Sequence, residues 1–233
     1  MKTEINRFNG FFAETINFFK ELKSNNNKKW FDQHQKLYED YVLNPAKDFI
    51  IAMGGRLSKL SPNINADPRV NKSLFRINRD TRFSIDKSPY KTNLGIIFWD
   101  DNMPRMESSV FYFHLEAGNI TLGTGIYKFT KHQLEMYRNL VLNPIYGEEL
   151  FNIIKNLSEK GYYFGGNNYK KVPKGYDTGY KNTELLLYDG LYVSKSLDIP
   201  EVFFSSEFVD FCYKYYKKML PVQKWLSDLI NKI

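Results

Sequence analysis

The hydrophobic periodicity of the chain changes at about Leu74, and this change constrains the fold more than any other feature of the sequence. Before Leu74, apolar residues recur every three or four positions, which is the spacing of one face of an α-helix. After it, apolar and polar residues alternate, as in strands with one buried face. Helical spacing returns after about residue 130. This order predicts an α+β fold, in which amino-terminal helices precede a mainly antiparallel sheet flanked by further helices.

The amino-terminal part predicts three helices before any strand. The first covers residues 9–23, the second follows Asn25-Asn26-Asn27, whose side chains can cap it, and the third begins near Pro45. Strands are then expected at residues 74–79, 82–85, 92–99, 109–116 and 119–127, with Ala117-Gly118-Asn119 as a hairpin turn.

The carboxy-terminal part returns to helical spacing at residues 131–142 and 147–160. A loop is expected over residues 161–180, then a short helix near Glu184, a strand at 191–196, and terminal helices from about Ser206 that Pro221 interrupts. The sequence contains no internal repeat or low-complexity linker, and we therefore predict a single α+β domain over residues 1–233.

Composition is typical of a globular protein. The 233 residues are 42% apolar, enough to bury a sizeable core and to rule out a disordered chain. Residues 1–12 lack the pattern of a signal peptide, and the longest apolar run elsewhere, near Trp99, is about six residues, far too short to span a bilayer. The single cysteine, Cys212, excludes an intramolecular disulfide. We therefore predict a cytoplasmic protein without a membrane partner.

The positive charge is concentrated in one segment. The formal charge of +7 comes from 33 basic and 26 acidic residues. Between Arg69 and Lys91 there are seven basic and two acidic residues, so the rest of the chain carries 26 bases against 24 acids. Four of the eight arginines lie within residues 69–82, although lysine outnumbers arginine elsewhere. Because arginine offers a planar fork that matches phosphate or carboxylate, this clustering indicates a geometric role.

The side chains of the basic segment divide into two faces if the backbone is extended. The apolar face contains Phe75, Ile77, Phe83 and Ile85, and the polar face contains Arg76, Asn78, Asp80, Arg82, Ser84 and Asp86. Arg79 falls on the apolar face, where a guanidinium needs a carboxylate or several carbonyl groups around it.

These residues predict an anion site. The expected ligand-binding residues are Arg76, Arg79, Arg82, Lys87, Tyr90 and Lys91. Asp80 and Asp86 are the candidates for acid-base catalysis. A role in orienting the arginines is favoured over metal binding, since metal sites usually draw carboxylates from several segments. We therefore predict no metal site, and the sequence identifies no cofactor.

One long motif and two shorter ones resemble a known family. The long motif runs from Arg79 to Asn93, and the shorter ones are residues 22–31 and Pro173-Lys174-Gly175-Tyr176. Together they are similar to the domain-of-unknown-function 2461 family of conserved hypothetical proteins of bacteria and fungi. The resemblance implies a single-domain protein and brings no established activity. The family often has a His-Pro pair after the Pro-Lys-Gly segment, where this chain has Thr178-Gly179-Tyr180.

Other motifs carry less information. The three histidines, His34, His114 and His132, show no zinc-ligand spacing, and the favoured interpretation of His114 is a satisfied sheet histidine rather than a cleft residue. The chain has no phosphate-binding glycine loop and no serine-hydrolase or metalloprotease motif. Residues 170–176 form a second basic patch, interpreted as a solvated loop or as a cover for the same anion.

Three functions remain open from the sequence. The favoured one is a site for an anionic, phosphorylated small molecule or nucleotide, in an enzyme or a binding protein. The second is a nucleic-acid-binding module, indicated by a pI near 9.2 and 17 tyrosines. The third is a structural network of arginines and carboxylates, with function in protein–protein interaction. The oligomeric state is not predicted.

Overall fold

Helices form the amino-terminal part of the fold, as the periodicity predicts. The computed structural model describes residues 8–100, 104–105, 107–176 and 182–230. Its first helices are α1 (Ala13–Ser24), α2 (Lys28–Tyr38) and α3 (Asn44–Leu57), with a π-helical segment, Glu39–Leu43, joining α2 to α3. Asn27 caps α2 by accepting a hydrogen bond from the Trp30 amide at 3.0 Å. The three predicted helices are therefore confirmed.

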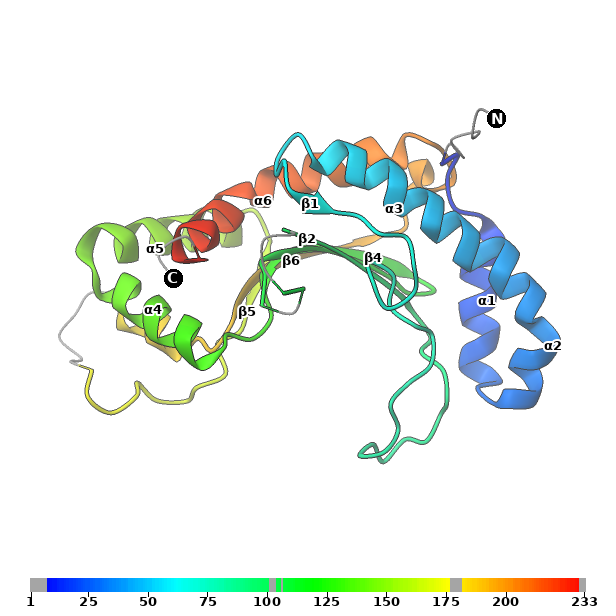
Figure 1. Cartoon of the computed structure of the whole chain (residues 1–233), viewed down its shortest axis with the longest axis horizontal. Helices are drawn as coiled ribbons and strands as arrows, with labels where there is room; N and C mark the ends of the chain where they lie inside the picture. Colours follow the sequence, from blue (N-terminus) through cyan, green and yellow to red (C-terminus); the bar gives the residue numbers. More distant parts are fainter. Residues whose placement is uncertain (1–7, 101–103, 106, 177–181, 231–233) are drawn as a thin grey trace. The chain divides into compact units, whose positions relative to one another are not determined.

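Six strands form an antiparallel sheet in the order β1-β2-β3-β4-β6-β5. Their bounds are β1 Ile64–Asn65, β2 Leu94–Asp100, β3 Val110–Leu115, β4 Asn119–Ile126, β5 Tyr163–Gly165 and β6 Leu191–Asp198. The β5–β6 register pairs Tyr163 with Ser194 and Gly165 with Tyr192. Together with the helices, this sheet confirms the α+β class (Figure 1).

The remaining helices are α4 (Lys131–Leu142), α5 (Pro144–Glu159) and α6 (Phe208–Ile230), with short 3-10 helices at Thr183–Leu187 and Glu201–Phe204. The predicted break at Pro221 is wrong, because this proline lies inside the continuous helix α6. Burial of Tyr216, Met219 and Val222 on α6 outweighs the backbone hydrogen bond that proline cannot donate. The strand β5 was not expected within residues 161–180, since three residues are too few to show alternation.

Two predicted strands are absent from the described residues. No strand lies between β1 and β2; residues 74–79 take part only in isolated bridges, which pair Leu74 with Val70 and Ile96 and pair Asn78 with Tyr90, and residues 82–85 take part in none. Alternation had placed Phe83 and Ile85 on a buried face, but these side chains are 94% and 101% exposed. The prediction fails for residues 82–85 because no helix or strand of the described chain packs over Phe83 and Ile85, so that the alternation of apolar and polar residues does not correspond to a buried face here.

The chain clusters into two compact units. Unit 1 contains residues up to Phe98, Tyr112–Leu122 and Ser196–Tyr215, and unit 2 contains Trp99–Phe111, Gly123–Lys195 and residues from Tyr216 onward. In unit 1, Phe49 of α3 packs against Phe113 of β3 with ring centroids 5.0 Å apart. In unit 2, Gln223 accepts hydrogen bonds from the buried hydroxyls of Ser109 and Thr124, at 2.5 and 2.8 Å. The single domain over residues 1–233 stays a prediction.

Candidate functional site

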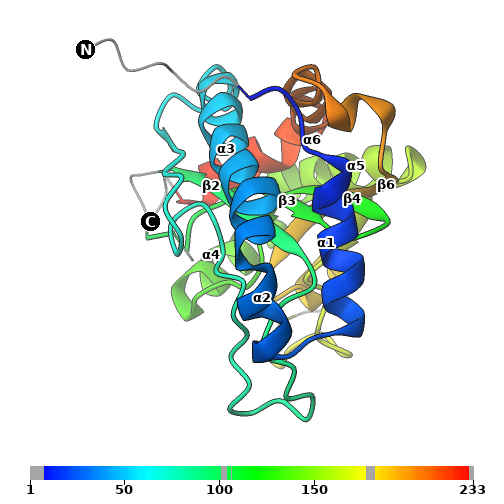
Figure 2. The ribbon, with the colours of Figure 1, turned by 90° about the vertical axis from the view of Figure 1, so that its right-hand side faces the viewer.

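The candidate residues lie on the long connection between β1 and β2. Residues 77–79 pair with residues 89–91, and we call this paired region the neck. The Arg79 amide donates to the Pro89 carbonyl at 2.9 Å, and the Lys91 amide donates to the Ile77 carbonyl at 2.8 Å. Residues 80–88, which we call the loop tip, therefore form a projecting loop whose two ends are held together at the neck (Figure 2). The extended segment expected from the sequence is thus replaced by a braced loop.

The neck is attached to the turn between α1 and α2. The Asn26 side chain donates to the Tyr90 carbonyl at 2.8 Å and accepts from the Tyr90 amide at 3.1 Å. The Tyr90 ring stacks on Phe31 with centroids 4.2 Å apart, and only 7% of this residue is exposed. These contacts join segments that are 64 residues apart in the sequence and fix the position of the next residue, Lys91.

The clustered arginines bind carboxylates of the same loop. Arg79 pairs with Asp86 and also donates to the Ser88 carbonyl and the Ser84 hydroxyl, both at 3.3 Å. This arrangement supplies the partners that the sequence required for Arg79. Arg82 donates two hydrogen bonds to Asp80, at 3.0 and 2.7 Å. Both aspartates therefore orient arginines, the role that the sequence favoured over metal binding.

The same contacts set the protonation of the aspartates. Hydrogen bonds from the Ser88 hydroxyl and amide, followed by that from Arg79, hold the pKa of Asp86 well below its usual range. A side-chain hydrogen bond from Arg82 lowers the pKa of Asp80 in the same way. A carboxylate with a lowered pKa is a weak general base. The catalytic role of Asp80 and Asp86 stays a prediction.

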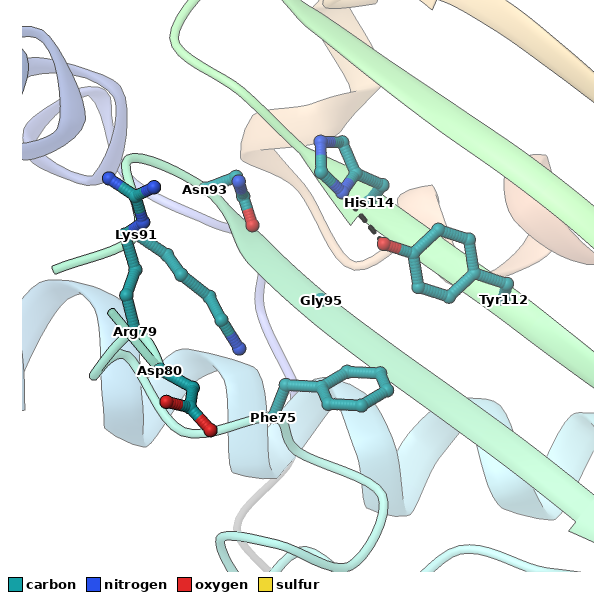
Figure 3. A pocket seen from close by; sticks show the side chains of 8 residues that line it. All are labelled: Phe75, Arg79, Asp80, Lys91, Asn93, Gly95, Tyr112 and His114. Atoms are coloured by element: carbon teal, nitrogen blue, oxygen red, sulfur yellow. Dashed lines mark hydrogen bonds between the residues drawn. The ribbon is translucent and has the colours of Figure 1, made fainter. Parts of the chain in front are cut away.

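Two neighbouring pockets open beside the neck. The first, which we call the sheet-side pocket, has a volume of about 480 Å³. It is lined by Phe75, Arg79, Asp80, Lys91, Asn93, Gly95, Tyr112 and His114 (Figure 3). The second, the turn-side pocket, has a volume of about 380 Å³. It is lined by Lys23, Asn26, Arg79, Asp86, Ser88, Tyr90, Lys91, Thr92 and Asn93. Both volumes lie in the range of small-molecule sites.

Lys91 lines both pockets. Its ammonium group donates to the Arg76 carbonyl at 3.0 Å and lies 5.4 Å from the centre of the Phe75 ring. Within the part of the chain that the structure describes, it forms no ion pair. Burial, and then the nearby charge of Arg76, lower the pKa of Lys91. A partly desolvated cation attracts an anion more strongly than one in bulk water.

A chain of hydrogen bonds follows one face of β3. Phe111, Phe113 and Leu115 are buried, and alternation places Tyr112 and His114 on the opposite face. The Tyr112 hydroxyl lies 2.8 Å from Nδ1 of His114, and Nε2 of His114 lies 3.0 Å from the Glu116 carboxylate. Burial, and then Glu116, raise the pKa of Tyr112 to about 12, so that the phenol keeps its proton.

Gly95 forms the floor of the sheet-side pocket. A Cβ atom at this position would lie 3.0 Å from Cδ2 of Phe75 and 3.5 Å from the Tyr112 hydroxyl oxygen. The missing side chain therefore allows the Phe75 ring and the Tyr112 phenol to converge on the same space.

The structure brings only some of the predicted residues together. Arg79, Asp80 and Lys91 line the sheet-side pocket, and Asp86 and Tyr90 line the turn-side pocket. The other three predicted ligand-binding residues, Arg76, Arg82 and Lys87, line neither pocket.

The sequence did not identify Tyr112, Glu116 or Asn93 as site residues, and it set His114 aside. Alternation over residues 109–116 was the available signal, since it places positions 112, 114 and 116 on one face. It does not show which segment faces them.

The second basic patch lies in unit 2. Its Tyr176 and the neighbouring Tyr169 flank the guanidinium of Arg138, at 5.5 and 5.3 Å from the ring centroids. The departure from the family pattern at Thr178-Gly179-Tyr180 lies outside the described residues.

Metal-ligand clusters and membrane-spanning helices are both absent from the described residues. Among the described residues, no group of three or more histidine, cysteine, aspartate or glutamate side chains is arranged to hold a metal ion. No helix in the described ranges has both the length and the apolar character needed to cross a membrane. The cytoplasmic location stays a prediction.

Comparison with known proteins identifies a family. No curated protein matches the chain. A family model described as conserved hypothetical protein (DUF2461) matches residues 14–225, a span that contains the neck, the loop tip and every residue lining the two pockets. This match confirms the resemblance found in the sequence motifs. Because it covers more than half of the chain, the protein belongs to the DUF2461 family.

Proposed function

We propose that the two pockets bind an anionic small molecule, with a phosphate group as the favoured anion. The observation that carries the proposal is the position of Arg79 and Lys91, which line both pockets. Arg79 is held by Asp86 and can orient a ligand, whereas Lys91 forms no ion pair with the described residues and supplies uncompensated charge. The neutral amide of Asn93 lines both pockets as well and can add a directed hydrogen bond.

Conversion of the ligand is a further part of the proposal. An enzyme acting on a phosphorylated small molecule or nucleotide would stabilise developing negative charge with Arg79 and Lys91. Asp80 is the predicted acid-base residue that lines the sheet-side pocket together with Lys91 and His114 (Figure 3). A binding protein without catalysis would use the same cations to hold the ligand.

Replacing Lys91 by methionine tests the anion site. Methionine keeps most of the apolar stem but removes the charge, and we expect the affinity for inorganic phosphate and for nucleotides to fall about tenfold or more. Affinity is measured by calorimetry and by the rise in melting temperature with ligand. Lys87→Met is the matched control, because Lys87 lies on the same loop but lines neither pocket. Equal affinities in the parent protein and Lys91→Met would exclude the site.

A second candidate function is contact with a partner protein through the loop tip. Phe83 and Ile85 are almost fully exposed there, at 94% and 101%. The tip is braced by the ion pairs Arg79–Asp86 and Arg82–Asp80 and by a hydrogen bond from Lys87 to the Thr81 carbonyl at 2.9 Å. A braced loop presents two apolar side chains at low entropic cost. The complementary partner has an apolar pocket that receives them.

Site-specific photo-cross-linking in cells tests the loop tip. A photoreactive amino acid at Phe83 is expected to give a discrete cross-linked product, because this side chain would be inserted in the partner. The same amino acid at Ile145, an apolar residue that is 75% exposed on α5, is the control and is expected to give none. Identical products at both positions, or no product at Phe83, would count against this function.

The nucleic-acid alternative stays a prediction. Asp67, Asp86 and Asp80 engage Arg69, Arg79 and Arg82, so that part of the positive charge is compensated within the loop. No geometric feature of the described residues favours this alternative over a small anion.

A further inference from the structure

Three side chains mark the boundary between the two pockets. Arg79, Lys91 and Asn93 line both pockets, whereas every other lining residue belongs to one pocket alone. In the proposed site, an anion held by Arg79 and Lys91 therefore lies at this boundary and can extend to either side. The side that a second anionic group would take depends on the side chains that only one pocket contains.

The sheet-side pocket is unfavourable for a second anionic group. Among its lysine, arginine, aspartate and glutamate side chains, Asp80 is the one that this pocket does not share. The hydrogen bond from Arg82 lowers the pKa of Asp80, so that its carboxylate stays negative at neutral pH. A second anion beside this carboxylate would be repelled.

The turn-side pocket adds a cation instead. Lys23 lines this pocket alone, and its ammonium group forms no ion pair or hydrogen bond with any residue that the structure describes. Asp86 lines the pocket as well, but Arg79 and the hydroxyl and amide of Ser88 engage it. Lysine and arginine thus outnumber carboxylates by three to one here, against two to one in the sheet-side pocket. The excess positive charge favours an additional anionic group on this side.

Two neutral side chains beside these cations have unused hydrogen-bond donors. The Thr92 hydroxyl and the Asn93 amide make no hydrogen bond with the described residues, although both residues are half-buried. Polar groups withdrawn from bulk solvent are normally satisfied by the protein, by ordered water or by a ligand. Thr92 lines the turn-side pocket alone and can donate to a group beside Lys23, whereas Asn93 lies at the boundary.

The backbone around Lys23 is held in place on both sides. Leu22 is fully buried and anchors the end of α1, and the Asn26 side chain bonds to both backbone groups of Tyr90 in the neck. These contacts keep the end of α1 beside the neck. Because Lys23 lies outside the basic segment of residues 69–91, the charge pattern of the sequence did not assign it to the site.

We propose that the turn-side pocket receives a second phosphate of the ligand, held by Lys23 and Thr92, while Arg79, Lys91 and Asn93 hold the first. The ligand class is therefore a diphosphate, either inorganic pyrophosphate or a nucleoside diphosphate. This inference rests on the proposed function, because it requires the first anion at the boundary. Lysine suits the outer phosphate, since it offers a compact charge on a flexible stem.

Calorimetry with pyrophosphate and orthophosphate, without divalent cations, tests the second position. Using the full chain, we expect the parent protein to bind pyrophosphate at least about tenfold more tightly than orthophosphate, the value of one added hydrogen bond to a charged group. Lys23→Met removes the charge and keeps most of the stem. It is expected to lower the pyrophosphate affinity about tenfold and to weaken orthophosphate much less. Lys91→Met should weaken both anions.

Three further variants separate a defined contact from a general effect of positive charge. Lys20→Met removes an exposed lysine of the same helix that lines neither pocket, and it should retain the full preference for pyrophosphate. Lys23→Arg keeps the charge and should retain most of the preference. Thr92→Val removes the hydroxyl and is expected to lower the preference about threefold. A general charge effect would give equal losses in Lys20→Met and Lys23→Met.

ADP and AMP extend the test to nucleotides and identify the source of the diphosphate. We expect the parent protein to prefer ADP over AMP and Lys23→Met to lose this preference. ADP bound more tightly than pyrophosphate would identify a nucleoside diphosphate, and the reverse order would identify the inorganic ion. ADP bound no more tightly than AMP by the parent protein would contradict the second phosphate position.

The two levels of failure are distinguishable. Pyrophosphate bound no more tightly than orthophosphate by the parent protein, or equal losses in Lys20→Met and Lys23→Met, overturns the second position. In that case a weaker complex of orthophosphate with Lys91→Met still supports the first anion site. Absence of measurable binding of either anion by the parent protein overturns the proposed function and the second position with it.

Discussion

Replacing Phe49 by alanine is expected to lower the free energy of unfolding by about 3–5 kcal/mol. Phe49 is fully buried on α3, and its ring lies within 6 Å of four others, from Phe8, Phe11, Phe113 and Phe208. These rings come from the chain before α1, from β3 and from α6. Deleting one side chain therefore leaves a cavity between several elements of unit 1 that cannot all collapse into it. Urea denaturation followed by circular dichroism measures the change.

Phe204→Ala is the matched control for Phe49. Phe204 is also a phenylalanine of unit 1, but it is 46% exposed, and the ring packed against it is Phe203, at 5.3 Å. We expect this substitution to cost less than about 1.5 kcal/mol, because less apolar surface returns to water. If the two variants were equally stable, the cluster around Phe49 would not be the core of the unit.

Asn26→Ala is expected to lower the free energy of unfolding by about 2 kcal/mol. The substitution removes two hydrogen bonds at once, at 2.8 and 3.1 Å, and leaves the backbone carbonyl and amide of Tyr90 without their partner. Because Tyr90 is only 7% exposed, water cannot fully replace the lost side chain. The neck should loosen, and Lys91 should lose its fixed position. Denaturation gives the energy, and hydrogen exchange of the Tyr90 amide gives the local effect.

Asn25→Ala provides the comparison for the neighbouring position. Asn25 donates at 2.9 Å to the Glu21 carbonyl of its own helix end and is exposed. Exchange at the Tyr90 amide should therefore remain slow in Asn25→Ala and become fast in Asn26→Ala. Slow exchange in both variants would show that the neck is held by other contacts.

The helices and most strands could be predicted from periodicity. The helix α4 has the expected bounds, and β2, β3, β4 and β6 lie at the expected places, because a regularly repeated apolar face or, in β2, a continuous buried run marks each of them in the local sequence. The predictions are wrong where the spacing of apolar residues, or a proline, does not match which side chains are buried. The loop tip exposes Phe83 and Ile85, and the helix α6 continues through Pro221 because its buried face is long.

The candidate site was partly accessible to sequence reasoning. The cluster of arginines indicated a segment from which Arg79, Asp80 and Lys91 line a pocket, and their part in binding a ligand stays a prediction. Composition could not show that Asp80 and Asp86 would engage Arg82 and Arg79, since ion pairing depends on the path of the backbone. The role proposed for Lys91 rests on its position beside the neck, where it lines both pockets.

The sequence alone determined the α+β class, the places of most helices and of β2, β3, β4 and β6, and the segment that concentrates positive charge, because each of these depends on neighbouring residues. The tertiary structure decided which charges are compensated and which line a pocket. It also placed Tyr112 and His114 opposite Lys91, and joined Asn26 to Tyr90 across 64 residues. These relations depend on distances in space between remote segments, which no local pattern of residues encodes.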